Sequence, residues 1–155
     1  MESAKILVFK VRATRVVFAH VMPLKGAVLD WVIQQCARDL ERLGHYGQVT
    51  LRSDQEAAIV DVLREIANLR GARETLLEHS PVTDSQSNGL IERGIRSVEE
   101  MTRVNLFDLS CRIGSPISVH SVFLWIGEHL TDILNKCHVV SDGTSAYERL
   151  KTRQN

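Results

Sequence analysis

The sequence predicts an α/β fold with a mixed sheet flanked by helices. Two runs rich in β-branched and aromatic residues, 6–9 and 16–21, open the chain, and the polar segment between them predicts an antiparallel hairpin. Helical and extended patterns then alternate from residue 27 to residue 79. A hairpin followed by alternating helices and strands favours a sheet of mixed strand directions with helices on both faces.

The middle of the chain contains a helix and a strand with clear boundaries. Residues 27–43 repeat apolar side chains at the helical period and stop at Gly44, a residue type that commonly follows a helix. Residues 48–51 form a short β-prone stretch, and the pattern changes to helical just after it, at Asp54. The predicted order up to this point is therefore two strands, a helix and a strand, with a second helix beginning.

The second helix should extend to Gly71, and residues 75–79 predict a short edge strand. Turn-forming residues follow this strand, after which residues 86–106 and 118–137 predict two long helices. A short helix or turn at residues 145–151 completes the chain. The periodicity also predicts buried positions in the four longer helices, namely Val28, Trp31, Val32, Cys36, Leu40, Ala57, Ile59, Val60, Val62, Leu63, Ile66, Leu69, Ile91, Ile95, Val98, Val119, Val122, Phe123, Ile126, Leu130, Ile133 and Leu134.

Composition limits the class of protein. A length of 155 residues is typical of one domain, which we expect to span residues 1–155. Lys+Arg 19 balances Asp+Glu 19, so any nucleic-acid contact must come from a local patch of charge. The three cysteines lack metal-ligand spacing, which favours reduced thiols buried as small apolar residues in an intracellular protein. No stretch is apolar and long enough to span a membrane.

Two carboxylates are the strongest candidates for a functional site. Asp54 follows the strand at residues 48–51, and Glu92 follows the turn-rich stretch 84–89 at the start of a long helix. Each residue also has an ordinary structural interpretation. Ser53 or Asp54 would suit the N-cap of the next helix, and an acidic residue near a helix start is favoured by the helix dipole.

The two segments together resemble a known family. Ser53-Asp54-Gln55-Glu56 and Ser85-Gln86-Ser87-Asn88-Gly89-Leu90-Ile91-Glu92 are similar to the segments that carry the second and third acids of the retroviral and retrotransposon integrase core. Glu92 follows Asp54 by 38 positions, close to the usual separation of those acids. The resemblance covers nearly the whole chain, and it implies an RNase H-like fold that lacks its first strand.

The resemblance implies DNA integration by magnesium-dependent phosphoryl transfer, with Asp54 and Glu92 as catalytic residues and metal ligands. The partners would be DNA and a second copy of the chain, and the site of action would be nuclear if the DNA is chromosomal. The first catalytic Asp of the family lies on a strand that would fall ahead of Met1. We therefore expect the 155-residue chain by itself to be inactive, because a two-metal site needs its bridging acid.

Polar residues around Glu92 are candidates for binding the DNA backbone. Gln86, Ser87 and Asn88 are expected in the loop before the acid, where turn chemistry is the ordinary alternative. Arg96 lies one helical turn after Glu92 and could contact a phosphate, although a solvated row of ion pairs is also consistent with Arg96, Glu99 and Arg103.

Two other functions remain open from the sequence. A non-enzymatic remnant of such an element could act in dimerisation or in weak nucleic-acid binding. An unrelated α/β domain could instead hold a small ligand near Asp54, and a sheet with all strands parallel would support that alternative.

Overall fold

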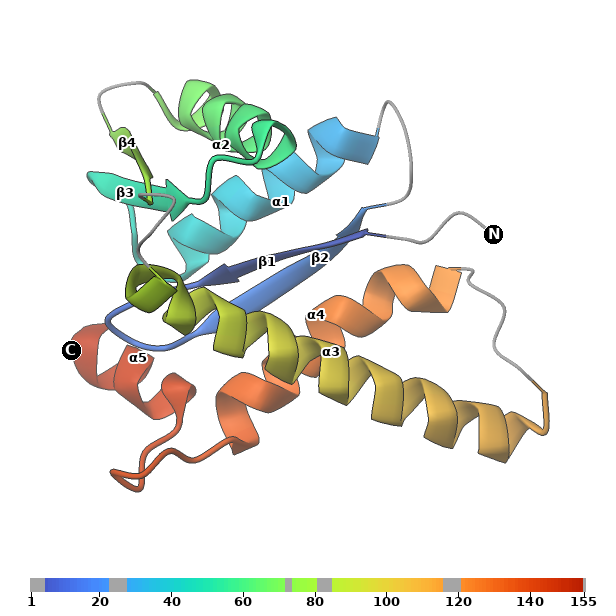
Figure 1. Cartoon of the computed structure of the whole chain (residues 1–155). Coiled ribbons are helices and arrows are strands. Elements are labelled where there is room, and N and C mark those ends of the chain that lie inside the picture. Colours follow the sequence, from blue (N-terminus) through green and yellow to red (C-terminus); the bar gives the residue numbers. More distant parts are fainter. Residues whose placement is uncertain (1–4, 23–27, 72–73, 81–84, 116–120, 155) are drawn as a thin grey trace. The chain divides into compact units, whose positions relative to one another are not determined.

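The computed structural model describes residues 5–22, 28–71, 74–80, 85–115 and 121–154, and the chain divides into two compact units. One unit comprises Met1–Leu24 with Leu90–Asn155, and the other comprises Lys25–Gly89. The elements in chain order are β1 (Lys5–Lys10), β2 (Val17–Met22), α1 (Val28–Arg42), β3 (Val49–Ser53), α2 (Ala57–Arg70), β4 (Thr75–His79), α3 (Ser85–Ile113), α4 (Ser121–Cys137) and α5 (Ala146–Gln154) (Figure 1).

The first unit is built on an antiparallel hairpin. β1 and β2 pair in a register that runs from Lys5 opposite Met22 to Lys10 opposite Val17. α4 packs along β2, and α5 packs on α4. Residues of both strands and two helices form one apolar cluster, in which Ile6, Val8, Val17, Ala19, Val98 and Leu134 pack together. Burial of this cluster stabilises the unit.

The turn between β1 and β2 contains an unusual backbone conformation. The Val11 N–H donates to the Val16 carbonyl over 2.8 Å, and the Arg15 N–H donates to the Val11 carbonyl over 2.8 Å. Arg15 has a φ of 66°, in the left-handed region that costs an L-residue with a Cβ about 1 kcal/mol. The turn therefore holds the Arg15 side chain in a position set by a strained backbone.

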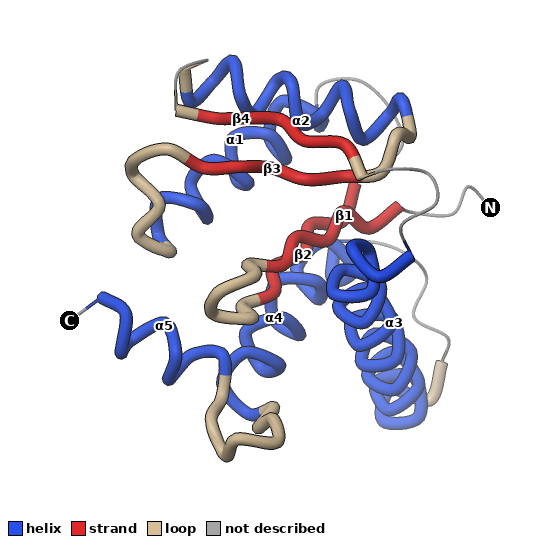
Figure 2. Tube along the Cα trace, turned by 60° about the vertical axis from the view of Figure 1, so that its left-hand side comes forward, coloured by secondary structure: helices blue, strands red, loops and turns tan. Residues whose placement is uncertain are grey.

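The second unit is a β–α–β arrangement with one added helix. β3 and β4 pair in parallel, from Val49 opposite Thr75 to Ser53 opposite His79, and α2 connects them (Figure 2). α1 packs against α2. A helical connection is what joining two parallel neighbouring strands requires. It places the carboxyl ends of both strands at the same edge of the small sheet.

Local interactions close the ends of the helices in this unit. Gly44 has a φ of 82°, its N–H donates to the Glu41 carbonyl, and the His45 N–H donates to the Leu40 carbonyl, which is a Schellman-type ending for α1. Arg70, the last residue of α2, donates from Nη2 to the carbonyls of His45 (2.8 Å) and Gly47 (3.2 Å). The guanidinium thereby secures the chain between α1 and β3.

The predicted α/β class and element order are confirmed, including the helix end at Gly44. The strands run in mixed directions as predicted, but the described strands form two two-stranded sheets, one in each unit. α3 extends to Ile113, seven residues beyond the predicted end. α4 begins at Ser121, and the predicted start at residue 118 lies outside the described residues.

Several helix positions predicted to be buried are exposed, because the face that each helix packs against the rest of its unit is narrower than the apolar face of its sequence. The exposed residues of this set include Trp31, Leu69, Ile95 and Val122. The buried positions include four that periodicity alone did not select, namely Ile33, Ala37, Ala67 and Thr102. Val119 and the side chains of Val28 and Phe123 lie outside the described part of the structure.

The three cysteines differ in their environments. Cys36 is fully buried in α1, and this burial raises the pKa of its thiol well above the ordinary value. Cys111 and Cys137 are exposed, so the prediction that every cysteine is a core residue is wrong for these two. Among the described helices, none combines the length and apolar character that crossing a membrane requires.

Candidate active site

Asp54 is the first residue after β3, at the carboxyl end of the parallel pair of strands. Ligands of α/β proteins commonly bind at this edge, because the loops that leave the strands gather there. The Asp54 side chain is exposed, and its Oδ1 accepts a 3.3 Å hydrogen bond from the Glu56 N–H. Its second carboxylate oxygen, Oδ2, has no hydrogen bond to another described residue, which leaves it available to a cation.

The cap of α2 differs from the expected one. The N-cap position is Glu56, whose side chain makes no capping hydrogen bond. Asp54 forms the turn that precedes the helix, while the Ser53 hydroxyl donates to the Asp54 carbonyl over 2.8 Å. The interpretation of Ser53 or Asp54 as the N-cap is therefore wrong, since the helix starts later than the sequence pattern indicated.

β4 brings two further polar residues to the same edge. His79 lies opposite Ser53 in the parallel register, and the Ser80 N–H donates to the Ser53 carbonyl over 2.8 Å. Ser80 is buried, and its hydroxyl has no hydrogen-bond partner among the described residues. Sequence reasoning assigned Ser80 only to a turn-rich loop. Only the parallel pairing of β4 with β3 places Ser80 beside Asp54, and this pairing could not be predicted from the local sequence.

Glu92 lies just over two turns from the start of α3, as predicted for the first turns of a helix. Its side chain is exposed, together with those of Arg96, Glu99 and Arg103. The buried positions of this part of the helix are Gly94, Val98 and Thr102, which belong to a different stripe. The prediction that Glu92 faces away from the core is therefore confirmed.

The predicted ion pairs around Arg96 are not formed. Within the described residues, no acidic group lies in ion-pair contact with Arg96 or Arg103, whereas Arg112 and Asp108 form an i,i+4 pair at 2.7 Å further along α3. The interpretation of this face as a row of ion pairs is wrong near Glu92. Arg96 is left as an exposed cation one turn from that carboxylate.

The polar residues before Glu92 belong to the helix itself. Gln86, Ser87 and Asn88 fall in the first turn of α3, which confirms the helix predicted from residue 86, whereas the expectation of a loop at these three positions is wrong. Asn88 is half-buried, and the side chains of Gln86 and Ser87 lie outside the described part of the structure. The backbone N–H groups in the first turn of a helix have no partner within the helix, so they can bind an anion.

Asp54 and Glu92 belong to different compact units, and each is positioned by its own unit. Their donor chemistry suits magnesium, since both are exposed carboxylates on or beside regular elements. Across the residues described, no three or more His, Cys, Asp or Glu side chains gather into a metal-binding group. Each acid by itself therefore has the donor chemistry of a magnesium ligand.

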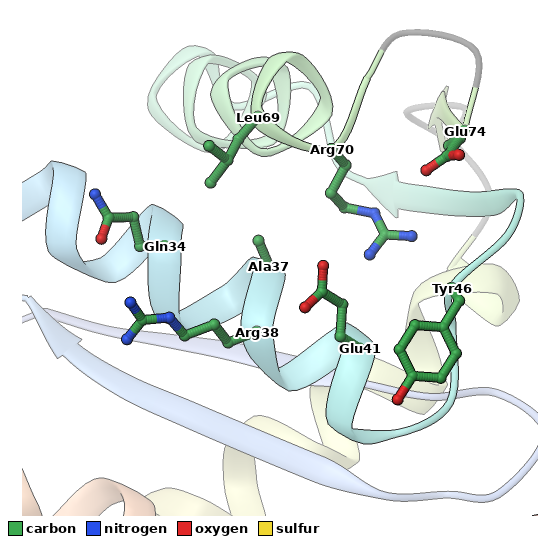
Figure 3. Close-up of a pocket in the computed structure, with 8 residues that line it drawn as sticks. All are labelled: Gln34, Ala37, Arg38, Glu41, Tyr46, Leu69, Arg70 and Glu74. Carbon is green, nitrogen blue, oxygen red and sulfur yellow. The ribbon is translucent and has the colours of Figure 1, made fainter.

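A separate hollow of about 380 Å³ lies between α1 and α2 in the second unit (Figure 3). Its lining includes Arg38, Glu41, Tyr46, Arg70 and Glu74. The side chains of opposite charge face into the same space, and none of the residues predicted for the site lines it. The lining of this hollow consequently adds nothing to the chemistry of Asp54 or Glu92.

Known proteins resemble this chain in fold and not in sequence. No family model matches the sequence, and no curated protein is significantly similar to it. The BIV integrase catalytic core domain matches with a TM-score of 0.64 and 20% identity, over 97% of this chain and 88% of that one. The HTLV-2 integrase catalytic core domain, in a dimeric form in complex with magnesium, matches with a TM-score of 0.60 and 11% identity, over 95% and 92% of the two chains. The chain has the fold of a retroviral integrase catalytic core.

Proposed function

We propose that this chain is the catalytic core of an integrase-like enzyme of a retrotransposon or retrovirus-like element, which joins DNA ends by phosphoryl transfer. The observation that carries the proposal is the placement of both motif acids within this fold. Asp54 ends a strand of a parallel pair, and Glu92 is exposed in the early turns of a long helix. These are the positions that the sequence motifs of the integrase core require.

Asp54 and Glu92 would act as ligands of magnesium. The metal, when bound, would stabilise the attacking and leaving oxygens of the phosphodiester. The protein groups would position the substrate. Arg96 is an exposed cation one turn from Glu92, and Asn88 lies in the first turn of the same helix. With Gln86 and Ser87, these residues would bind the DNA backbone and orient the scissile bond.

The resemblance places a further acid on a strand ahead of the segment that begins at Lys5. Two carboxylates alone are a poor site for a pair of magnesium ions, whose geometry tolerates little variation. We therefore expect the 155-residue chain tested by itself to join no DNA. A chain extended by a strand that carries one Asp ahead of Lys5 should join DNA in the presence of magnesium or manganese.

A strand-transfer assay on labelled duplex ends tests this proposal. It compares the chain, the extended chain, and the extended chain with Asp54→Asn or Glu92→Gln. Each substitution should lower joining at least about 100-fold, because it removes a metal ligand. The matched control is Asp61→Asn, an exposed carboxylate on α2 that pairs with Arg64 and should leave joining unchanged.

Two outcomes would contradict the proposal. Joining by the unextended chain would overturn the expectation of inactivity. Full activity of the extended chain after loss of either acid would remove Asp54 and Glu92 from the site. Parallel strands throughout would have supported the rival interpretation as an unrelated α/β ligand-binding domain, and the antiparallel pairing of β1 with β2 does not give that support.

An exposed aromatic surface on α4 supports self-association as a second function. Trp125 and Val122 are 59% and 46% exposed, and the Trp125 ring stacks on His129 with centroids 4.4 Å apart. Val122 and Trp125 are three positions apart on one helix, and neighbouring exposed apolar side chains favour contact with another chain. Light scattering should find a dimer that Trp125→Glu converts to a monomer, while Glu100→Gln leaves it intact. A wild-type monomer at high concentration would reject this function.

A further inference from the structure

Lys10 is the last residue of a row of β1 side chains, and its side chain lies against α3. Ile6 and Val8 pack in the core cluster with Val98 of α3, and Lys10 lies on the same face because side chains alternate along a strand. Its side chain crosses Gly94, one turn before Val98. A Cβ at Gly94 would lie 3.1 Å from Lys10 Cδ and 3.9 Å from Lys10 Nζ. The absence of a side chain at Gly94 is what allows the ammonium to lie against the helix.

Two more cations surround this ammonium. Arg93 precedes Gly94 on α3, and Arg15 belongs to the strained turn that follows β1. Burial, together with the charges of Arg15 and Arg93, lowers the pKa of Lys10. Among the described residues, no carboxylate forms an ion pair with Lys10 or Arg15. The positive charge of Lys10 and Arg15 therefore favours an anion from outside the chain.

We propose that Lys10, Arg15 and Arg93 form a subsite for a phosphate group of a nucleic-acid backbone. The choice of nucleic acid rests on the proposed function, whereas the cluster itself rests on the geometry of the first unit. Guanidinium groups match phosphate oxygens with two parallel donors, and the half-buried ammonium adds a fixed charge. Arg93 directly follows Glu92 in α3, so a phosphate bound here would lie at the same turn of the helix as that carboxylate.

Binding of a fluorescein-labelled DNA duplex, followed by anisotropy at several salt concentrations without divalent metal, tests the subsite. With at most four charge contacts, from the three subsite cations and Arg96, log affinity against log salt should have a slope of about −3 to −4. Lys10→Gln, Arg15→Asn and Arg93→Gln should each reduce the slope by about 1. Asn tolerates the left-handed conformation of Arg15, so this substitution removes charge without adding strain. Arg64→Gln is the control, since Arg64 lies in the second unit and pairs with Asp61.

Gly94→Ala tests whether DNA binding depends on the position of the Lys10 ammonium and not only on the number of positive charges. The added methyl group would displace the Lys10 side chain and should weaken DNA binding about 3-fold or more at low salt, with no change in net charge. Gly89→Ala is the matched control in the same helix, because no atom of the described residues lies within 4 Å of a Cβ there. It should bind DNA as the wild type does. Unfolding curves of all variants establish that each is folded.

Equal slopes for the wild type and the three charge variants would overturn the subsite, and so would a wild type that does not bind DNA. Full displacement of the duplex by millimolar inorganic phosphate would overturn a site for a backbone phosphate and indicate a site for the free anion. The strand-transfer assay measures the loss of Asp54 or Glu92 with the cluster intact, whereas the anisotropy experiment measures the loss of cluster charges with both acids intact and no divalent metal. Failure of either proposal would thus be visible while the other stands.

Discussion

Asn135 of α4 binds the backbone of Val17 with both ends of its amide. The Val17 N–H donates to Asn135 Oδ1 over 2.8 Å, and Asn135 Nδ2 donates to the Val17 carbonyl over 2.6 Å. Both groups of Val17 point away from β1, because the N–H and C=O of one strand residue lie on the same side. The amide takes the place of a neighbouring strand at the start of β2 and ties this strand to α4.

Asn135→Ala should lower the free energy of unfolding by about 2 kcal/mol, since two partly buried backbone groups would lose their partners. Urea unfolding measures this as a lower midpoint with an unchanged m-value. Asn105→Ala is the comparison, because Asn105 donates only to the Met101 carbonyl of its own helix. A midpoint for Asn135→Ala as high as that for Asn105→Ala would mean that the amide contributes little.

Gly127 sets the approach of α4 to β2. A Cβ at Gly127 would lie 3.3 Å from Val21 Cγ2 and 3.4 Å from the Ala19 carbonyl oxygen. Gly127→Val should cost about 2–3 kcal/mol, because the larger side chain forces the helix off the strand. Thermal unfolding measures the cost, and Gly89→Ala, with open space around it, should be neutral or stabilising. A Gly127→Val protein as stable as the wild type would refute this close packing.

The α5 helix begins with a capping box that should be sensitive to acid. The backbone N–H and the hydroxyl of Ser145 both donate to Glu148 Oε2, and these bonds lower the pKa of Glu148. A lowered folded-state pKa means that the contribution to stability is present above the ordinary pKa of 4.5 and is lost as the pH falls through the lowered value.

An NMR titration of Glu148 should therefore give a midpoint below that of an ordinary Glu. Ser145→Ala should raise this midpoint only part of the way, because the backbone N–H bond remains. A midpoint for Glu148 at or above the ordinary value of 4.5 would contradict the capping box.

Arg70 should be important for the stability of the second unit. Its guanidinium donates to the His45 and Gly47 carbonyls and, from Nε, to Thr75 Oγ1 over 3.3 Å. Arg70→Met keeps most of the apolar stem and should cost about 1–2 kcal/mol, with faster amide exchange between α1 and β3. Arg64→Met removes an exposed ion pair and should cost well under 1 kcal/mol. Equal losses for the two variants would argue against this role.

The thiols should react in two classes. Cys111 and Cys137 are exposed and should be modified quickly by a thiol reagent in the native protein. Cys36 is buried with a raised pKa, so it should react only when the protein unfolds. Counting modified thiols by mass spectrometry with and without denaturant checks this. Rapid native labelling of Cys36, tested as the only cysteine remaining after serine replacement of the others, would contradict its burial.

Much of the candidate site could be predicted from local sequence. Asp54 follows a β-prone stretch and Glu92 starts a helical period, so both positions were readable from pattern alone. The prediction that the two acids share one site had another source, namely the resemblance of two short motifs to the integrase core. Ser80 and Lys10 could not be selected, because the first depends on pairing with β3 and the second on a glycine 84 positions further along the chain.

The sequence by itself determined the type, order and approximate limits of the elements, because hydrophobic period and turn residues act over a few neighbouring positions. The tertiary structure decided which apolar residues are buried. Trp31 and Val122 satisfy a helical period and yet are exposed, while Thr102 is buried. It also decided the partners of Asn135 and Arg70, whose hydrogen bonds join distant segments. Such contacts depend on the packing of whole elements, which no local pattern contains.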